Sequence, residues 1–405
     1  MNSGDAAREK YLEKPIANFD IAKHDTRQLV EAYSGIRGVG GDVAVATDIM
    51  VRSLKDPTTT RFLTMAGSAD GQGLMNVWPA MVDRNMYDAV MTTGAIAIDM
   101  HVFHAMGFHY YHGNPNVDNE EMGDLEVNRM YDANMDEREL VLVDETIAEF
   151  LDSLRPAIYS PRQIMWELGK WLSEHPTVAK KRTLPQACFE NGVPYFCLGL
   201  TDSSFGMGST YHQLRRVLEG KEAVKIDTTP EYADLAKIKL AAQTTGFETI
   251  GGGLPTNHVQ DTIIVAQGVL QTLRAMGRTD LVEHFGYGPT EIEDEVPLHK
   301  YAIKVTVADV RDGACSSSTL EEARTWGKVD LANQKMVFAE ATLAAPIMAS
   351  ATFHTADWKH TREHRRWADW LNALKSPSDF GKSVGKKGSF VRSAVGVPLT
   401  VKHVG

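Results

Sequence analysis

Phe247-Glu248-Thr249-Ile250-Gly251-Gly252-Gly253-Leu254-Pro255 is the stretch that best predicts the fold of this 405-residue chain. Its apolar and β-branched residues indicate a buried strand, which three glycines then stop abruptly. A helical pattern lies between residues 74 and 82, and comparable strand-like runs, stopped by Gly, Asp or Thr, recur at 60–67, 87–95, 194–200 and 301–307. This alternation predicts an α/β fold with a doubly wound, mostly parallel sheet of the Rossmann-like kind.

The bulk composition excludes several classes of protein. With 43% hydrophobic and 23% charged residues, the chain is long enough for one large globular domain or two smaller ones. A formal net charge of -11 argues against general nucleic-acid binding and suits a cationic small molecule, although solubility alone explains such a charge equally well.

The cysteines and the apolar segments bear on location. Cys188, Cys197 and Cys315 show no C-x-x-C spacing, so neither a disulfide framework nor a zinc signature is expected. The first 25 residues lack the apolar core of a secretory signal, and no run of about 18 apolar residues occurs. We expect a soluble cytoplasmic protein that is not associated with membranes.

Three segments are expected along the chain: a polar N-terminal arm (1–25), the main catalytic domain (26–354), and a basic helix with a tail (355–405). An acid-rich stretch between 114 and 145 predicts a surface insertion or an exposed helix. The Trp-rich, basic stretch from 358 to 374 predicts a helix that is solvated or contacts another subunit, followed by a Gly/Lys/Ser-rich tail.

Four histidines, His101, His104, His109 and His112, form the first candidate site. His101 and His104 have the spacing of neighbours on a helix, as metal ligands can. However, no H-E-x-x-H pattern occurs, and Gly107 is expected to end the helix between the two pairs. Packed or hydrogen-bonded histidines are therefore favoured, and no metal is expected.

Two glycine-rich loops follow strand-like runs. At 67–73, small residues would let backbone N–H groups approach a pyrophosphate, but an ordinary tight turn explains them equally well. At 251–253, three glycines predict close approach to a flat ligand such as nicotinamide. A flexible loop is the alternative there, although Pro255 stiffens the exit.

The stretch from Asp312 to Lys328 contains a predicted helix. Ser318 with Glu321, or Thr319 with Glu322, would start it, and Trp326 and Lys328 would close it. Taken by itself, a lysine in a last helical turn is ordinarily a favourable charge against the helix dipole.

Several segments together resemble deoxyhypusine synthase and its homospermidine synthase relatives. They are Thr-Thr-Gly at 92–94, Leu-Thr-Asp-Ser-Ser-Phe-Gly at 200–206, Gly-Gly-Gly-Leu-Pro at 251–255, Asp-Gly at 312–313, Glu-Ala-Arg-Thr-Trp-Gly-Lys at 322–328 and Ala-Glu-Ala-Thr at 339–342. They occur in the order of that family over about residues 60 to 352. Trp-Gly-Lys together with the triple glycine is the specific part, and it implies that Lys328 is catalytic.

The resemblance implies a two-stage reaction. NAD takes a hydride from a polyamine donor such as spermidine, and Lys328 then carries the aminoalkyl group as a covalent imine. An acceptor amine displaces the lysine, and the hydride returns. A lysine must be neutral to attack, which calls for burial or neighbouring cations.

The family's site positions fall on defined residues of this chain. The resemblance implies that NAD is contacted by Gly67, Ser68, Gly71, Thr93, Gly94, Ala95, Asp202, Gly252, Val307, Ala308, Glu340 and Ala341. For the substrate it implies Asp99, Met207, Asp312, Cys315, Glu322 and Trp326, with Trp326 as the pocket tryptophan. It further implies a homotetramer with sites at a dimer interface.

Two departures from the family pattern bear on the chemistry. Ile98, Met207 and Cys315 stand where carboxylates hold the donor, and each lost charged hydrogen bond is worth about 1.5–3 kcal/mol. Asn257 stands at the position of a histidine base and cannot accept a proton. If the backbone is extended there, the adjacent His258 points the other way and cannot replace it.

The favoured interpretation is an aminoalkyl transferase with a small amine acceptor, as in homospermidine synthesis. The alternatives are deoxyhypusine synthase acting on a translation-factor lysine, and a non-catalytic NAD-binding regulator or scaffold. Lys328 and Trp326 argue against the last alternative, because a binding module needs neither.

Overall fold

A six-stranded parallel sheet forms the centre of the molecule. The computed structural model describes residues 3–242, 244–290, 296–355, 357–360 and 362–373. The strands are β1 (Thr59–Met65), β2 (Ala89–Thr93), β7 (Tyr195–Leu198), β9 (Thr244–Ile250), β10 (Tyr301–Val305) and β11 (Gln334–Val337). Their order is β11-β10-β9-β1-β2-β7, and every neighbouring pair is parallel.

The strand order reverses at the middle of the sheet. Phe62 of β1 pairs with Ala89 of β2 on one side and with Phe247 of β9 on the other. From β1 the chain builds outward to β7, and it then returns to start again at β9. Doubly wound sheets open a ligand crevice at such a reversal, outside the carboxyl ends of the strands. The predicted α/β architecture with a parallel sheet is confirmed.

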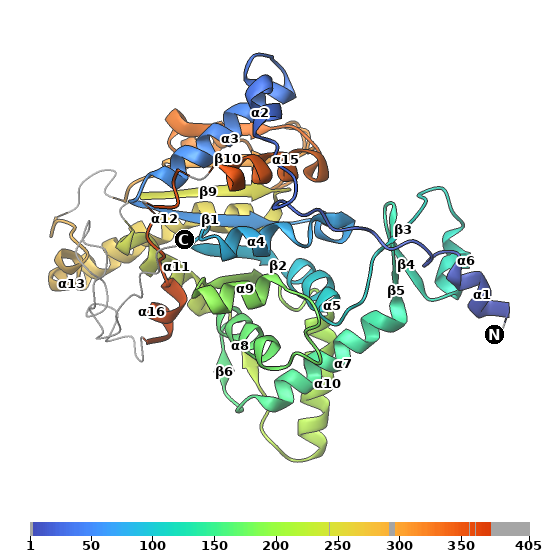
Figure 1. Cartoon of the computed structure of the whole chain (residues 1–405). Coiled ribbons are helices and arrows are strands. Elements are labelled where there is room, and N and C mark those ends of the chain that lie inside the picture. The colour runs from blue at the N-terminus through green and yellow to red at the C-terminus, as the bar shows by residue number, and fades with distance from the viewer. Residues whose placement is uncertain (1–2, 243, 291–295, 356, 361, 374–405) are drawn as a thin grey trace.

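Alternate residues of each strand face two separate hydrophobic cores, as Leu63 and Phe62 illustrate. The first core packs against α3 (Val39–Lys55), α4 (Val77–Asp83), α7 (Glu137–Ser153), α8 (Pro161–Glu174), α9 (Leu184–Asn191), α10 (Ser204–Leu218) and α15 (Ala341–His354). The second packs against α11 (Thr229–Ala241), α12 (Gly253–Ala275), α13 (Thr279–His284), α14 (Leu320–Thr325) and α16 (Trp367–Ala373). Helices therefore cover both faces of the sheet, and Figure 1 shows α3 beside α15 on one of them.

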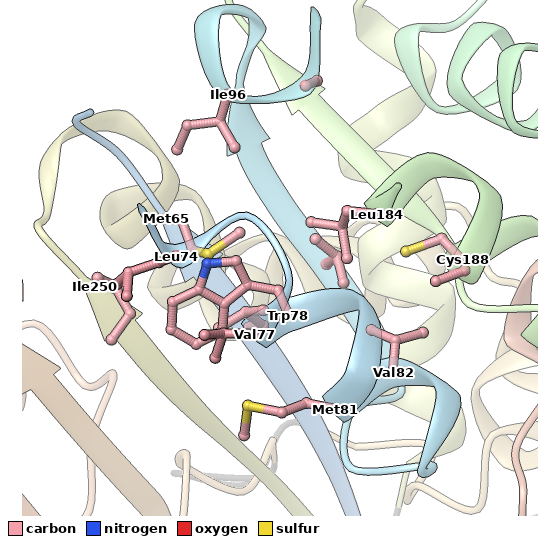
Figure 2. Close-up of a cluster of buried hydrophobic side chains, with 14 of the residues drawn as sticks. Met65, Leu74, Val77, Trp78, Met81, Val82, Ile96, Leu184, Cys188 and Ile250 are labelled. Atoms are coloured by element: carbon pink, nitrogen blue, oxygen red, sulfur yellow. The ribbon is translucent and has the colours of Figure 1, made fainter. Parts of the chain in front are cut away.

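The first core is dense at the carboxyl ends of the central strands. Figure 2 shows Trp78 of α4 within this cluster, near Met65, Leu74 and Ile250. The indole nitrogen donates a hydrogen bond of 2.7 Å to the buried Asp70. The loops after β1 and β9 are thus supported by the buried side chains packed around Trp78.

A small antiparallel sheet lies beside the large one and includes much of the acid-rich stretch. It consists of β3 (Tyr111–His112), β5 (Ala133–Asp136) and β4 (Val127–Met130), with α6 (Asn119–Asp124) next to it. The N-terminal segment with α1 (Ser3–Glu9) joins it, because Pro15 bridges to Tyr111 and Arg8 pairs with Asp136. In Figure 1 these elements project to the right of the main body.

The C-terminal segment packs into the molecule instead of lying in solvent. Trp358, Trp367 and Trp370 are buried, and the fully buried Arg362 forms an ion pair with Asp88. The prediction of a solvated helix is therefore wrong for the described residues of this segment. The Gly/Lys/Ser-rich tail lies outside the described residues.

Shorter elements complete the described fold: α2 (Arg27–Ser34), α5 (His101–Ala105), the π-helical turns η1 (Asp70–Leu74) and η2 (Ala95–Met100), the 3-10 turn η3 (Leu331–Asn333), and the parallel pair β6 (Ile158–Tyr159) and β8 (Lys225–Ile226). Within the described ranges, none of the helices combines the length and apolar character needed to cross a bilayer.

Candidate active site

The loops that follow β1 and β9 meet at the reversal of strand order. The backbone nitrogen of Ala66 donates to the carbonyl of Ile250 at 3.0 Å. A Cβ atom on Gly251 would lie 2.2 Å from the carbonyl oxygen of Ala66, and Gly251, Gly252 and Gly253 all have positive φ angles. Glycine is required here because only it tolerates both the backbone conformation and this close approach.

Helix α12 starts directly from this glycine loop and forms one wall of a cavity of about 680 Å³. Helices α11 and α14 and the segments on either side of α14 complete the lining. The lining residues are Tyr232, Asn257, Gln260, Asp261, Ile264, Val265, Ser318, Thr319, Glu322, Ala323, Trp326 and Lys328.

Lys328 brings a buried amino group into this cavity. Trp326 ends α14, Gly327 follows with φ +68, and the backbone nitrogen of Lys328 donates to Ala323 at 3.1 Å. The lysine Nζ lies 2.8 Å from Oδ1 of Asp261 and 3.3 Å from Oδ1 of Asn257. A lysine nucleophile was expected to be buried or to have cations as neighbours. Lys328 is buried, with 8% of its surface exposed, but the charged group next to it is a carboxylate and not a cation.

Trp326 lies at the open side of the cavity. Its ring centroid is 5.5 Å from Lys328 Nζ, within the range of a cation–π contact. The side chain is 64% exposed, so one face of the ring contacts the lysine while much of the remainder faces outward.

Asn257 and Asp261 are one helical turn apart on α12 and point the same way. The amide nitrogen Nδ2 of Asn257 donates to Oδ2 of Asp261 at 3.1 Å. The expectation that 257 and 258 follow an extended backbone is wrong, because both lie inside α12. The helix turns about 100° between them, so His258 still points elsewhere, for a different geometrical reason.

His258 is buried against Tyr232 of α11, with ring centroids 4.2 Å apart. Its Nε2 has no hydrogen-bond partner among the described residues. Burial lowers the pKa of His258 to about 4, and the nearby Asp261 opposes that shift only in part. His258 is therefore a neutral ring packed behind the cavity.

Lys304 supports the cavity wall from the sheet. It is fully buried in β10, and its Nζ donates to the carbonyl of Ser318 at 2.6 Å and lies 3.5 Å from that of Cys315. Burial lowers its pKa to about 8, while the cavity residue Glu322 acts in the opposite direction.

The residues proposed for substrate binding are divided between two places. Glu322 and Trp326 line the cavity with Lys328, whereas Asp99, Met207, Asp312 and Cys315 do not. Asp99 accepts a 2.8 Å hydrogen bond from the backbone nitrogen of Ser204, and burial raises its pKa to about 6. Ile98 is fully buried in the first core, so its side chain does not form a wall of the cavity.

The residues proposed for NAD lie in loops at the carboxyl edge of the sheet. Thr93 ends β2, and Gly94 and Ala95 lead into η2. Asp202 follows β7, Val307 and Ala308 follow β10, and Glu340 and Ala341 begin α15. A Cβ on Gly94 would lie only 2.8 Å from the carbonyl oxygen of Gly199. Glycine at position 94 therefore allows the loops after β2 and β7 to pack closely together.

The loop after β1 combines open space with dense packing. Gly67 has φ +103, and a Cβ there would meet nothing within 4 Å; Ser68 follows it at the edge of the sheet. Gly71 lies inside η1, where a Cβ would be 2.8 Å from the Met130 side chain. A side chain at position 67 would thus enter open space, whereas one at position 71 would meet the ends of the Met130 and Tyr110 side chains.

The buried histidines of the candidate group, His101 and His104, pack within the fold, and His101 forms hydrogen bonds to neighbouring elements. His101 Nε2 lies 3.0 Å from Oδ2 of Asp70, and its Nδ1 accepts from the backbone nitrogen of Leu184. Burial lowers the pKa of His104 to about 3, and Lys181 adds to this. No cluster of three His, Cys, Asp or Glu side chains suited to a metal occurs in the described part of the chain.

Three residues of the site escaped the sequence analysis: Asp261, Tyr232 and Lys304. Asp261 carried a usable signal, because it follows Asn257 by four residues and a helical reading of 253–275 would have put the two side by side. Tyr232 comes from α11, which sequence spacing does not relate to Lys328.

Comparisons with known proteins agree on one family. A family model described as deoxyhypusine synthase matches residues 28–352. A deoxyhypusine synthase-like protein of Coxiella burnetii is 39% identical over 371 residues, covering 92% of this chain and 97% of the relative. Those of Caulobacter vibrioides (39% over 362 residues, 89% and 91% covered) and Chlorobaculum tepidum (36% over 349 residues, 86% and 92% covered) are also similar.

Proposed function

The chain belongs to the deoxyhypusine synthase family, and from that premise we propose that it is an NAD-dependent aminoalkyl transferase with Lys328 as the covalent carrier. Membership of the family implies a transferase. The observation that carries the finer proposal is the buried Lys328 amine inside a cavity, between a carboxylate and a tryptophan.

We propose that the dinucleotide binds at the carboxyl edge of the sheet, where doubly wound sheets bind their ligands. Three glycines with positive φ angles shape the loop at the reversal point, and a Cβ on Gly67 would meet no atom within 4 Å. Gly67, Ser68, Thr93 to Ala95, Asp202, Gly252, Val307, Ala308, Glu340 and Ala341 would hold NAD there, with Gly71 supporting the loop. Bound NAD would supply the acceptance and return of a hydride.

The residues of the chain itself would divide the remaining tasks. Lys328 attacks the imine carbon of the oxidised donor and carries the aminoalkyl group. Glu322 offers a carboxylate to the ammonium group of the donor, and Trp326 contacts its methylene groups. Asn257 orients Asp261 and Lys328 through its two amide atoms.

A small amine is the proposed acceptor, as in homospermidine synthesis. Asp261 and Glu322 are the two carboxylates of the lining, and Asp261 is already paired with Lys328. Few acids remain for a donor with several charges, which favours a short or weakly charged amine. Deoxyhypusine synthesis on a protein lysine and non-catalytic NAD binding are the alternatives.

Exposed apolar side chains favour assembly into the proposed homotetramer. Trp326, Ile264 and Leu254 near the cavity, and Met207 and Val307 near the sheet edge, are all at least 47% exposed. A second copy that covers them would exclude water from the site and could bring Asp99, Met207, Asp312 and Cys315 of one protomer near Lys328 of another. Light scattering and subunit-mixing assays with complementary inactive variants test this arrangement.

Borohydride trapping tests the main proposal. The protein is incubated with NAD and a panel of diamines and polyamines, reduced, digested and mapped by mass spectrometry. We expect a donor-dependent label on Lys328 that Lys328→Arg abolishes and the control Lys300→Arg retains. Product masses then identify donor and acceptor. A label on another residue, or none with any donor, would contradict the proposal.

A further inference from the structure

The chemistry proposed for Lys328 requires a nearby group that exchanges protons with its nitrogen. The atoms that contact Nζ are Oδ1 of Asp261 at 2.8 Å and Oδ1 of Asn257 at 3.3 Å. An amide oxygen cannot take a proton at neutral pH, and the histidine next in sequence is packed against Tyr232. Asp261 therefore has both the position and the chemistry.

The two oxygens of Asp261 have different closest partners, and the side chain of Tyr232 also interacts with this carboxylate. Oδ2 accepts from Nδ2 of Asn257 at 3.1 Å, which leaves Oδ1 directed at Lys328. Both residues lie on consecutive turns of the 23-residue helix α12, so the carboxylate is held by a rigid element and not by a loop. A carboxylate fixed in this way keeps its geometry while the substrate changes.

We propose that Asp261 is the acid–base catalyst of the amine-exchange steps at Lys328, an inference that rests on the proposed function. As the lone pair of Nζ forms the new C–N bond to the imine carbon, the proton released from Nζ passes to Oδ1 of Asp261. Oδ1 then gives that proton to the departing nitrogen, whose C–N bond breaks with both electrons leaving on nitrogen. Each exchange is redox-neutral, and the reverse sequence releases Lys328 to the acceptor amine.

Proton transfer accompanies the bonding changes at Nζ. Attack on the imine carbon requires the neutral amine form of Lys328, because only that form has a lone pair to donate. Once Nζ is bonded to a carbon that carries a second nitrogen, it becomes more acidic and the transfer to Asp261 becomes feasible. Asp261 thus accepts the proton that Nζ loses as the C–N bond forms.

Glu322 has a different role from Asp261. It lines the same cavity but acts electrostatically on the buried Lys304 behind the wall, whereas the carboxylate paired with Lys328 is that of Asp261. Two carboxylates in different surroundings can serve as proton carrier and as substrate anchor respectively.

An exchange assay without NAD separates this inference from the proposed function. Cinnamaldehyde is condensed with the folded protein, and the Lys328 imine, verified by cyanoborohydride reduction and peptide mapping, is followed by its near-ultraviolet absorbance. Butylamine is then added, and the rate of imine displacement is recorded by stopped flow. Asp261→Asn should slow displacement by about 100-fold, whereas Asp280→Asn, an exposed control on α13, should leave it unchanged.

Chemical rescue distinguishes proton transfer from a structural role. In Asp261→Ala, added formate should restore displacement in a concentration-dependent manner, and chloride at equal ionic strength should not. Wild-type displacement rates in Asp261→Asn, or a folded Asp261→Ala that formate fails to rescue, would overturn the role of Asp261. Failure of donor trapping with NAD, while the exchange assay succeeds, would instead refute the proposed reaction.

Discussion

Gly252 and Gly253 are adjacent residues at the carboxyl end of β9 that should tolerate a side chain to different degrees. Both have positive φ angles, +147 and +64, but a Cβ on Gly252 would lie 2.6 Å from Cα of Ser316, whereas one on Gly253 would meet Ala66 Cβ at 3.7 Å. We expect Gly253→Ala to lower the free energy of unfolding by about 1–2 kcal/mol through its backbone conformation. Gly252→Ala adds a clash with backbone and should cost about 1–3 kcal/mol more. Urea unfolding of both variants checks this, and equal losses would show that the loop around Ser316 yields freely.

The sequence predicted some of the residues that line the cavity around Lys328, but not all of them. Trp326, Glu322, Asn257 and Lys328 line one cavity, in keeping with the motifs that singled them out. Asp261 was not predicted, because its importance follows from a contact with Lys328 across 67 positions of sequence that only the folded chain creates. Motifs mark residue types with unusual chemistry, whereas an ordinary aspartate gains its role from its neighbours.

Helix α11 shows how burial can outweigh the helix dipole. Glu231 lies in the first turn, where the dipole favours a charged carboxylate. Burial nevertheless raises its pKa to about 8, Asp234 adds to this, and the nearby Arg162 opposes it only in part. The protein therefore holds this proton more tightly when folded than when unfolded.

The sign of the resulting pH dependence follows from that difference. The unfolded state releases the proton near the ordinary glutamate pKa of 4.5, so the free energy of unfolding should fall as pH rises from about 4.5 to about 8. Glu231→Gln removes this contribution and should be more stable than the wild type by several kcal/mol at pH 9, with little difference at pH 4.5. Urea unfolding at pH 5, 7 and 9 measures it, with the exposed Glu174→Gln as control. Parallel curves for Glu231→Gln and wild type would contradict the assignment.

The sequence predicted individual strands of the central sheet, but neither their order nor the burial of the C-terminal segment. Runs such as 60–67 and 301–307 correspond to β1 and β10, because strands buried on both faces of a parallel sheet are rich in β-branched, aromatic and aliphatic residues. The order of the strands did not follow from those runs, since pairing of β1 with β9 depends on how helices over both faces pack. The segment from 358 was misread because the partners of its buried arginines are distant in sequence: Asp88 lies 274 residues away from Arg362.

The C-terminal segment is joined to the centre of the molecule by a buried ion pair. Arg362 pairs with Asp88 at a fully buried site and also donates to the carbonyl of Asn85 at 2.7 Å. Arg362→Ala would leave Asp88 buried without its main partner, which costs about 3–5 kcal/mol. Arg311→Ala, which removes an exposed pair with Asp309, should cost less than about 1 kcal/mol. Thermal unfolding of both variants tests this, and a loss below 1 kcal/mol for Arg362→Ala would show that the segment does not stabilise the fold.

The central position of β1 has a consequence for synthesis of the protein. Thr64 of β1 hydrogen-bonds to Thr249 of β9, 185 residues later in the chain. At translation rates of about 5–20 residues per second, one edge of β1 waits about 10–40 s on the ribosome for its partner strand. During that interval the nascent chain presents an unpaired apolar edge of the kind that aggregates or recruits chaperones. Yield in cells should therefore depend on chaperone supply and growth temperature more strongly than the equilibrium stability of the finished protein would suggest.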